Sequence, residues 1–235
     1  DSGRVNIRSF HFSLFDNIFL DPEYVESIVA ATPSGMFFDR DIEGFWVSAQ
    51  GVVYKDFKKD KHYITSKDLA GVNFKRYFAG VDWGYEHYGS IVVVGEDDKG
   101  CFYLLEEHAR QHEEIDFWVS VAKGIKERYG RINFYCDTAR PEYVKRFKRE
   151  GLYAKNADKA VLSGIEEVAK LIKTDKLKIV RDKVERFDKE IYMYAWNERT
   201  GEPIKLWDDV LDSLRYALYT HNKPTGAGVS SSRGW

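Results

Sequence analysis

The sequence predicts an α/β protein with a mixed sheet flanked by helices. Three apolar runs separated by turns predict an antiparallel meander, and a segment of helical apolar spacing then leads to a fourth strand. A strand, helix and strand in that order usually places the two strands side by side and parallel. Because 43% of the 235 residues are hydrophobic, the chain is able to bury a substantial core.

The first half of the sheet is the easier to predict. Strands are expected at Tyr77–Asp82, Ser90–Gly95 and Cys101–His108, with a turn before the third. The helix expected at Glu113–Tyr129 carries apolar residues at helical spacing and stops at a glycine. The strand Ile132–Cys136 follows, and we expect it beside Tyr77–Asp82 and parallel to it.

The second half alternates helices and short strands. Its expected helices are Pro141–Glu150, Ala160–Lys173 and Asp208–Tyr219, and its short strands are Leu152–Ala154 and Leu177–Val180. Residues 187–207 predict an inserted β-hairpin, with strands Ile191–Trp196 and Ile204–Trp207 around a glycine-containing turn.

Three parts are expected along the chain. Residues 1–57 are rich in aromatic residues and turn signals and contain one helical pattern, Pro22–Ala31. The charge run Lys55–Lys61 is interpreted as a solvated linker. Residues 58–222 would form the main domain, and residues 223–235, rich in Gly and Ser, a flexible tail.

Overall composition limits the possible partners. With 36 Lys and Arg against 38 Asp and Glu, the net charge is -2, so a generally basic nucleic-acid-binding surface is excluded and any polyanion site must be a local patch. The sequence contains no apolar run of membrane-spanning length, so we expect no contact with a membrane.

Acidic residues are placed where the predicted elements converge. Asp82 and Asp137 each close a strand, and the ends of neighbouring parallel strands share one crevice. Asp209 and Asp212 are three apart, which puts both on one face of the last helix. Clustered carboxylates repel one another unless protons or a cation neutralise them, and oxygen ligands favour Mg²⁺ or Mn²⁺. Two strand acids and a helix acid in this order are typical of metal-dependent nucleases.

A structural role is the alternative for each acid. Asp82 precedes a turn, Asp137 precedes a helix that it could cap, and Asp208 or Asp209 is placed to cap the last helix. Asp212 is harder to explain in this way, because it lies one turn inside a helix, where a buried acid needs a partner.

Four motifs resemble the C-terminal nuclease domain of the large terminase subunit of tailed bacteriophages. They are VDWG (Val81–Gly84), YCDTARPE (Tyr135–Glu142), ADKAVLSGIEEVAKLI (Ala157–Ile172) and DDVLDSLRYAL (Asp208–Leu218). The segments FHFSLFDN, PEYVESIVA and FWVSAQGVVYKDF resemble the end of the packaging ATPase that precedes it. No GxxxxGK[ST] occurs, so we expect the phosphate-binding loop upstream of these residues, outside this fragment.

The resemblance implies a ribonuclease H-like fold with a mixed five-stranded sheet, shared with Holliday-junction resolvases. It implies that Asp82 and Asp137 bind two Mg²⁺ or Mn²⁺ ions together with acids of the last helix. Many relatives read D-H-x-x-D there, and Asp209 stands in the His position. Because the resolvases use a pair of acids three apart in this helix, the resemblance implies that both Asp209 and Asp212 bind metal and take part in catalysis, with Asp212 as the main ligand of the two. The residues expected to contact DNA are Arg140, Lys155 and Lys159.

The function implied is a metal-dependent endodeoxyribonuclease. By resemblance it would cut concatemeric double-stranded viral DNA at the initiation and termination of packaging into procapsids in the host cytoplasm. The portal protein and the small terminase subunit would be its partners. Two alternatives stay open: a resolvase-like nuclease acting on branched DNA, and a non-catalytic module that docks on the portal through its aromatic N-terminal segment and its tail.

Overall fold

The computed structural model describes residues 10–45 and 51–223. Within them a seven-stranded mixed sheet runs in the order β1-β7-β4-β3-β2-β5-β6. The strands are β1 (Tyr63–Ile64), β2 (Phe74–Asp82), β3 (Gly89–Asp97), β4 (Phe102–Arg110), β5 (Asn133–Cys136), β6 (Tyr153–Asn156) and β7 (Leu177–Val180). The α-helices are α1 (Pro22–Ala31), α2 (Met36–Asp41), α3 (Lys59–His62), α4 (Ile115–Tyr129), α5 (Pro141–Arg149), α6 (Val161–Lys173), α7 (Arg186–Met193) and α8 (Asp209–Asn222).

The centre of the sheet has the predicted topology. Strands β2, β3 and β4 form an antiparallel meander, and β5 lies parallel to β2 after the α4 crossover. In this register Val81 lies opposite Cys136, and the amide of Asp137 donates a hydrogen bond to the Val81 carbonyl over 2.8 Å. The carboxyl ends of the two strands that carry Asp82 and Asp137 therefore lie next to each other.

The predicted count of five strands is wrong for the sheet as a whole. The first five expected strands form the contiguous set β4-β3-β2-β5-β6. Beyond β4 the sheet continues in parallel register with β7, which matches the strand expected at Leu177–Val180, and then with β1, which was not expected. Strand β1 has only two residues, too few for any alternation of apolar and polar positions to show in the sequence.

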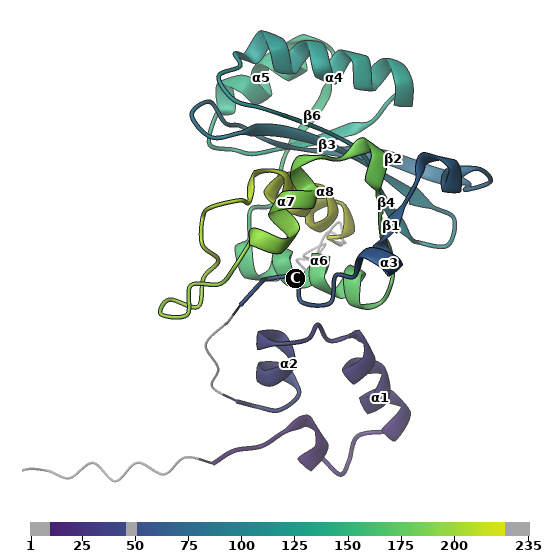
Figure 1. The fold of residues 1–235 in the computed structure, drawn as a ribbon, viewed down its shortest axis with the longest axis vertical. Helices are drawn as coiled ribbons and strands as arrows, with labels where there is room; N and C mark the ends of the chain where they lie inside the picture. The colour runs from purple at the N-terminus through teal and green to yellow at the C-terminus, as the bar shows by residue number, and fades with distance from the viewer. Residues whose placement is uncertain (1–9, 46–50, 224–235) are drawn as a thin grey trace, which may run out of the picture.

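Helices cover both faces of the sheet (Figure 1). On one face α4 and α5 bury residues such as Trp118 and Phe147 against the sheet. On the other face lie α6, α7 and α8, which contribute Ile165, Phe187 and Leu214 to a second core. Helix α8 packs against β2 and β3, so its first turn lies close to the end of β2.

The predicted inserted hairpin in residues 187–207 is wrong. Helix α7 replaces its first strand, because Phe187, Glu190, Ile191 and Tyr194 are buried at helical spacing. The run of aromatic and β-branched residues from position 191 to 196 suggested a strand. What remains of the hairpin is an isolated bridge between Trp196 and Pro203, with backbone hydrogen bonds from Asn197 to Glu202 and from Ile204 to Ala195 on either side of it.

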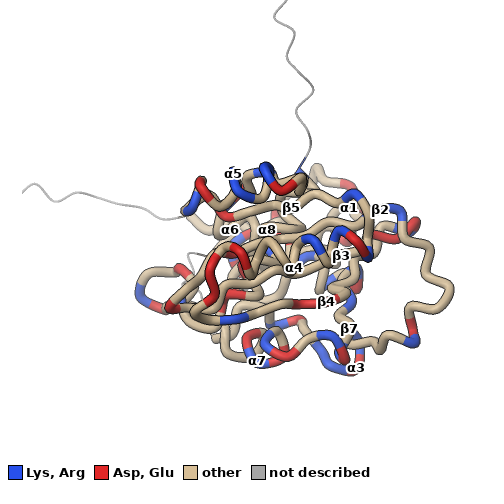
Figure 2. The backbone as a smooth tube through the Cα atoms, turned by 90° about the horizontal axis from the view of Figure 1, so that it is seen from above, with Lys and Arg blue, Asp and Glu red and all other residues tan. Residues whose placement is uncertain are grey.

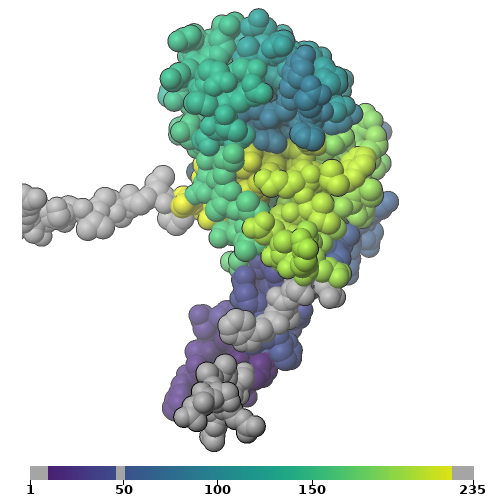
Figure 3. Space-filling model, turned by 90° about the vertical axis from the view of Figure 1, so that its left-hand side faces the viewer, coloured from purple at the N-terminus to yellow at the C-terminus, as the bar shows by residue number. Residues whose placement is uncertain are grey.

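The N-terminal residues 10–45 project from the rest of the chain (Figure 3) and contain α1 at the predicted position. They contact the main body through α2, where Phe37 packs edge-on against Trp196. The predicted linker is more ordered than expected, since Phe57 is buried and α3 lies within the charge run. The boundaries proposed at 57 and 223 stay predictions. Residues 46–50 and the rest of the predicted tail lie outside the described residues.

The last turn of α8 predicts a pH dependence of stability. His221 stacks on Phe78 of β2 with ring centroids 3.9 Å apart, and burial lowers the pKa of its imidazole from the ordinary value of 6.5 although Glu96 opposes this. The unfolded chain therefore binds a proton here before the folded chain does, so stability falls as the pH drops below about 6.5. We expect urea denaturation between about pH 7 and pH 5.5 to show a smaller loss of stability in His221→Gln than in the parent. An identical loss in both proteins would contradict this.

Candidate metal-binding site

One cavity of about 1200 Å³ opens at the carboxyl ends of β2 and β5. Glu86 and Glu114 line it, and so do five aspartates, the four predicted ligands and one more. The aspartates are Asp82, Asp137, Asp208, Asp209 and Asp212. Because the acids come from a strand end, the segment after a neighbouring strand and one helix, the tertiary fold brings together residues that are far apart in the sequence.

Asp82 is the acid with the least compensated charge. Burial raises the pKa of its carboxyl well above the ordinary value, and the charges of Asp212, Asp137 and Asp209 raise it further. No ion pair or side-chain hydrogen bond compensates it within residues 10–45 and 51–223. Asp82 therefore needs a proton or an external cation.

Asp137 is 5% exposed and forms an ion pair with Lys159. Its carboxylate also accepts a hydrogen bond from the amide of Ala139 over 3.1 Å, and its carbonyl accepts one from the Trp83 indole over 2.9 Å. The N-cap of α5 is Arg140, so Asp137 does not cap that helix. Its side chain instead holds a turn and faces the cavity.

The α8 acids each face an arginine. Asp209 lies 2.6 Å from Arg186 of α7, and Asp212 lies 2.8 Å from the buried Arg215 of its own helix. The N-cap of α8 is Asp208, but its side chain caps no amide, and burial together with Asp212 and Asp209 raises its pKa to about 6.

The donor set fits a divalent cation. Carboxylate oxygens are the ligands that Mg²⁺ and Mn²⁺ prefer, and the uncompensated charge of Asp82 is the kind that such an ion neutralises. Across the described chain, no three acidic, His or Cys side chains are close enough to hold an ion as they stand. An entering cation therefore has to displace at least one protein cation, and the half-exposed Lys159 is the most accessible of them.

No protein-family profile and no curated protein sequence matches this chain. Solved structures do match. A large terminase from a thermophilic bacteriophage superposes with a TM-score of 0.80 at 21% identity, over 92% of this chain and 56% of that one. The P22 large terminase nuclease domain matches with a TM-score of 0.60 at 18% identity, over 74% of this chain and 93% of that domain. The SPP1 large terminase nuclease domain with bound Mn matches with a TM-score of 0.56 at 19% identity, over 74% of this chain and 98% of that domain.

The fold is that of a large terminase nuclease domain. The predicted ribonuclease H-like class is therefore confirmed. This chain spans about half the length of the thermophilic-phage terminase structure that it matches.

In this terminase nuclease fold, two of the three predicted DNA contacts lie at the cavity. Arg140 and Lys159 line it, and Arg140 stacks over the Tyr143 ring at 5.2 Å. Lys155 is exposed on β6 and does not line the cavity. It follows α5, whose last turn carries Arg146, Lys148 and Arg149, and Figure 2 shows these cationic positions on α5.

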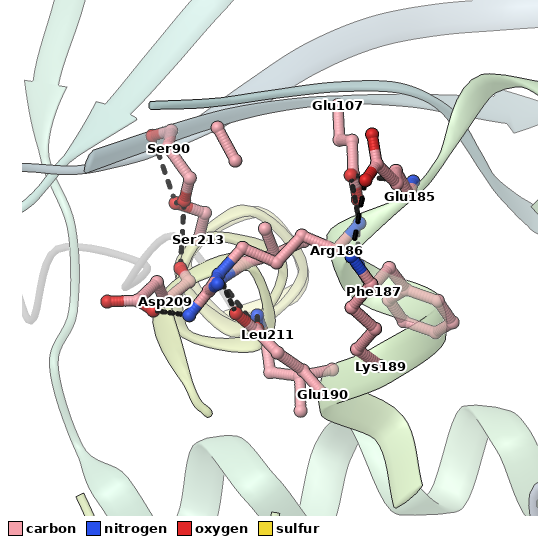
Figure 4. A network of polar contacts seen from close by, with 12 residues as sticks. Ser90, Glu107, Glu185, Arg186, Phe187, Lys189, Glu190, Asp209, Leu211 and Ser213 are labelled. Atoms are coloured by element: carbon pink, nitrogen blue, oxygen red, sulfur yellow. Dashed lines mark hydrogen bonds and ion pairs between the residues drawn. The ribbon is translucent and has the colours of Figure 1, made fainter. Parts of the chain in front are cut away.

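The residues behind the α8 acids were not predicted from the sequence. Arg186 lines the same cavity, and it contacts both Asp209 and the buried Glu190 (Figure 4). Arg186 and Glu190 are four residues apart, a spacing typical of an ion pair on a helix, but the aromatic run that follows them predicted a strand.

Within the described residues, the helices are all too short or too polar to span a membrane.

Proposed function

We propose that this chain is a divalent-metal-dependent DNA endonuclease that cuts concatemeric viral DNA at the initiation and termination of packaging. The observation that carries the proposal is the uncompensated Asp82 beside the carboxylates of Asp137, Asp208, Asp209 and Asp212, in one cavity of a terminase nuclease fold. The bound Mn in the SPP1 nuclease domain supports the choice of cation.

Asp82 and Asp137 are the proposed shared ligands, and Asp209 and Asp212 supply the α8 side of the site. Two ions held by these acids would supply charge stabilisation for in-line attack of water on a phosphodiester and for the departing 3′ oxygen. The acids hold the cations in place, while Arg140 and Lys159 orient the scissile phosphate through charge and hydrogen bonds. His87 also lines the cavity, where it is able to assist proton transfer.

The proposed substrate is double-stranded DNA, held by Arg140, Lys159 and Lys155. The proposed partners are the portal protein and the small terminase subunit, and the proposed location is the host cytoplasm. The resemblance of residues 1–57 to the end of a terminase ATPase and the match to the longer thermophilic-phage terminase favour a packaging enzyme over a resolvase.

A nicking assay tests the proposal against its alternatives. The purified chain is incubated with supercoiled plasmid and with a four-way junction of the same base composition, in Mn²⁺ or in EDTA. We expect Mn²⁺-dependent nicking of plasmid with no preference for the junction. Faster cutting of the junction would favour the resolvase alternative. No cutting of either substrate would leave only the portal-docking module.

Cation binding should also change stability. Saturating Mn²⁺, at about 100 times its dissociation constant, stabilises the folded state by about 2.7 kcal/mol, which for a chain of this size raises the melting temperature by roughly 5–10 °C. We expect this shift in the parent and a much smaller one in Asp137→Asn, measured by differential scanning fluorimetry. Asp98→Asn, in an exposed turn, is the control and should behave like the parent. Equal shifts in all three proteins would place the ion elsewhere.

A further inference from the structure

A fully buried acid lies directly behind the carboxylate cluster. Glu190 of α7 is 0% exposed, and one of its oxygens accepts hydrogen bonds from the amides of Val210 and Leu211 over 2.8 and 3.1 Å. These are first-turn amides of α8, where the N-cap Asp208 makes no capping bond. Glu190 therefore caps α8 from another helix, which adds an anion at the positive end of the helix dipole.

The other oxygen of Glu190 faces Arg186. The Nε atom of Arg186 lies 2.6 Å from Glu190, and its Nη2 atom lies 2.6 Å from Asp209. Its guanidinium carbon lies 3.6 Å from the centroid of the Tyr88 ring and 5.4 Å from that of Trp207. One positive charge is thus divided between a buried carboxylate and a carboxylate of the cluster, as Figure 4 shows.

The start of α7 is held in place independently of the cluster. Glu107 of β4 accepts hydrogen bonds from the amides of Glu185, Arg186 and Phe187 over 2.7, 2.5 and 3.0 Å. Because the sheet fixes the backbone at Arg186 and the aromatic rings confine its side chain, the guanidinium has little freedom to leave. Its effect on the cluster then depends on how its charge is shared.

A cation that enters the cluster competes with Arg186 for Asp209. Without a second acid, the whole charge of Arg186 would act on Asp209 and oppose a divalent ion. With Glu190 at an equal distance, part of that charge is already compensated. We propose that Glu190 is a positioning residue that sets the divalent-cation affinity of the cluster by compensating part of the Arg186 charge that acts on Asp209. This inference rests on the proposed function, in which the cluster binds the cation.

A double-mutant cycle tests it by Mn²⁺ binding alone, followed by the electron paramagnetic resonance signal of free Mn²⁺. The proteins are the parent, Glu190→Gln, Arg186→Gln and the double variant. Burial raises the pKa of the Glu190 carboxyl to about 8, against the opposing effects of Arg186 and the α8 amides. The titrations are therefore run without oxygen at about pH 9, where the carboxylate is mostly ionised.

We expect Glu190→Gln to bind Mn²⁺ about 10-fold more weakly than the parent, because neutral Gln keeps a capping oxygen but no longer shares the charge of Arg186. Arg186→Gln should bind at least as tightly as the parent, and the double variant should match Arg186→Gln. Glu185→Gln is the matched control, since its side chain is 85% exposed, and it should leave binding unchanged.

Two results would overturn the inference. The first is unchanged Mn²⁺ affinity in a folded Glu190→Gln. The second is an equal loss with and without Arg186, which would make Glu190 a helix cap only. If Glu190→Gln does not fold, Arg186→Gln decides alone: weaker Mn²⁺ binding refutes the inference, and equal or tighter binding supports it.

The two proposals can fail separately. If the parent does not bind Mn²⁺, or if Asp82→Asn leaves its Mn²⁺ binding unchanged, the proposed function fails and this inference fails with it. If that binding is present but the cycle gives either refuting result, only the role of Glu190 is lost.

Discussion

Asp82→Asn should abolish nicking while making the metal-free protein more stable. The substitution keeps the shape of the side chain but removes the carboxylate on which the cluster charges converge. Loss of a shared ligand removes several kcal/mol of transition-state stabilisation, so we expect the nicking rate to fall by at least about 1,000-fold. Because the same change relieves repulsion with Asp137, Asp209 and Asp212, the melting temperature in EDTA should rise.

The two readouts together exclude simple misfolding as the reason for lost activity. Plasmid nicking is measured in Mn²⁺ and thermal unfolding in EDTA, with Asp98→Asn as the matched control for both. A variant that is inactive and less stable than the parent would show that Asp82 holds the fold together. A variant that still nicks at the parental rate would refute its role as a ligand.

Gly80→Ala should be the most damaging single-methyl change near the site. Gly80 lies on β2 where α8 crosses it, and a Cβ atom there would lie 1.8 Å from the backbone carbonyl oxygen of Ser213. Ser213 is itself held by hydrogen bonds to Ser90 on β3, so α8 cannot retreat without breaking them. Forced overpacking of this kind costs about 1–3 kcal/mol or more.

We therefore expect Gly80→Ala to lower the melting temperature by roughly 5–10 °C. Mn²⁺ binding should also weaken, because a displaced α8 moves Asp209 and Asp212 away from Asp82. Gly124→Ala on α4 is the control, because a Cβ atom there meets only the end of the Arg128 side chain, at 3.4 Å. It should be neutral or stabilising by up to about 1 kcal/mol. A Gly80→Ala protein as stable as Gly124→Ala would contradict the close packing of α8 on β2.

Most of the site was predictable because strand ends can be read from the sequence. Asp82 and Asp137 each follow an apolar run, and the crossover rule alone places those runs side by side. The spacing of Asp209 and Asp212 needs only the helical period. In contrast, nothing local to Lys159, Arg186 or Arg215 shows which carboxylate each one faces.

The errors occurred where composition and tertiary packing disagree. Residues 191–196 have the composition of a strand, yet burial of Phe187, Ile191 and Tyr194 on one face selects a helix. That error also hid Glu190, because no helix was expected at residues 186–193 to place it beside the first turn of α8. The charge run before β1 looked like a linker, since the single buried Phe57 carries little weight among the lysines and aspartates around it.

The most direct test of the account is the anomalous diffraction of crystals grown with Mn²⁺. We predict Mn²⁺ peaks in the cavity within coordination distance of Asp82 and Asp137, with at least one of Asp209 and Asp212 as a further ligand and with Lys159 displaced from Asp137. Peaks that avoid Asp82, or a cavity without Mn²⁺ at concentrations that support nicking, would contradict the claim that these carboxylates form the metal site.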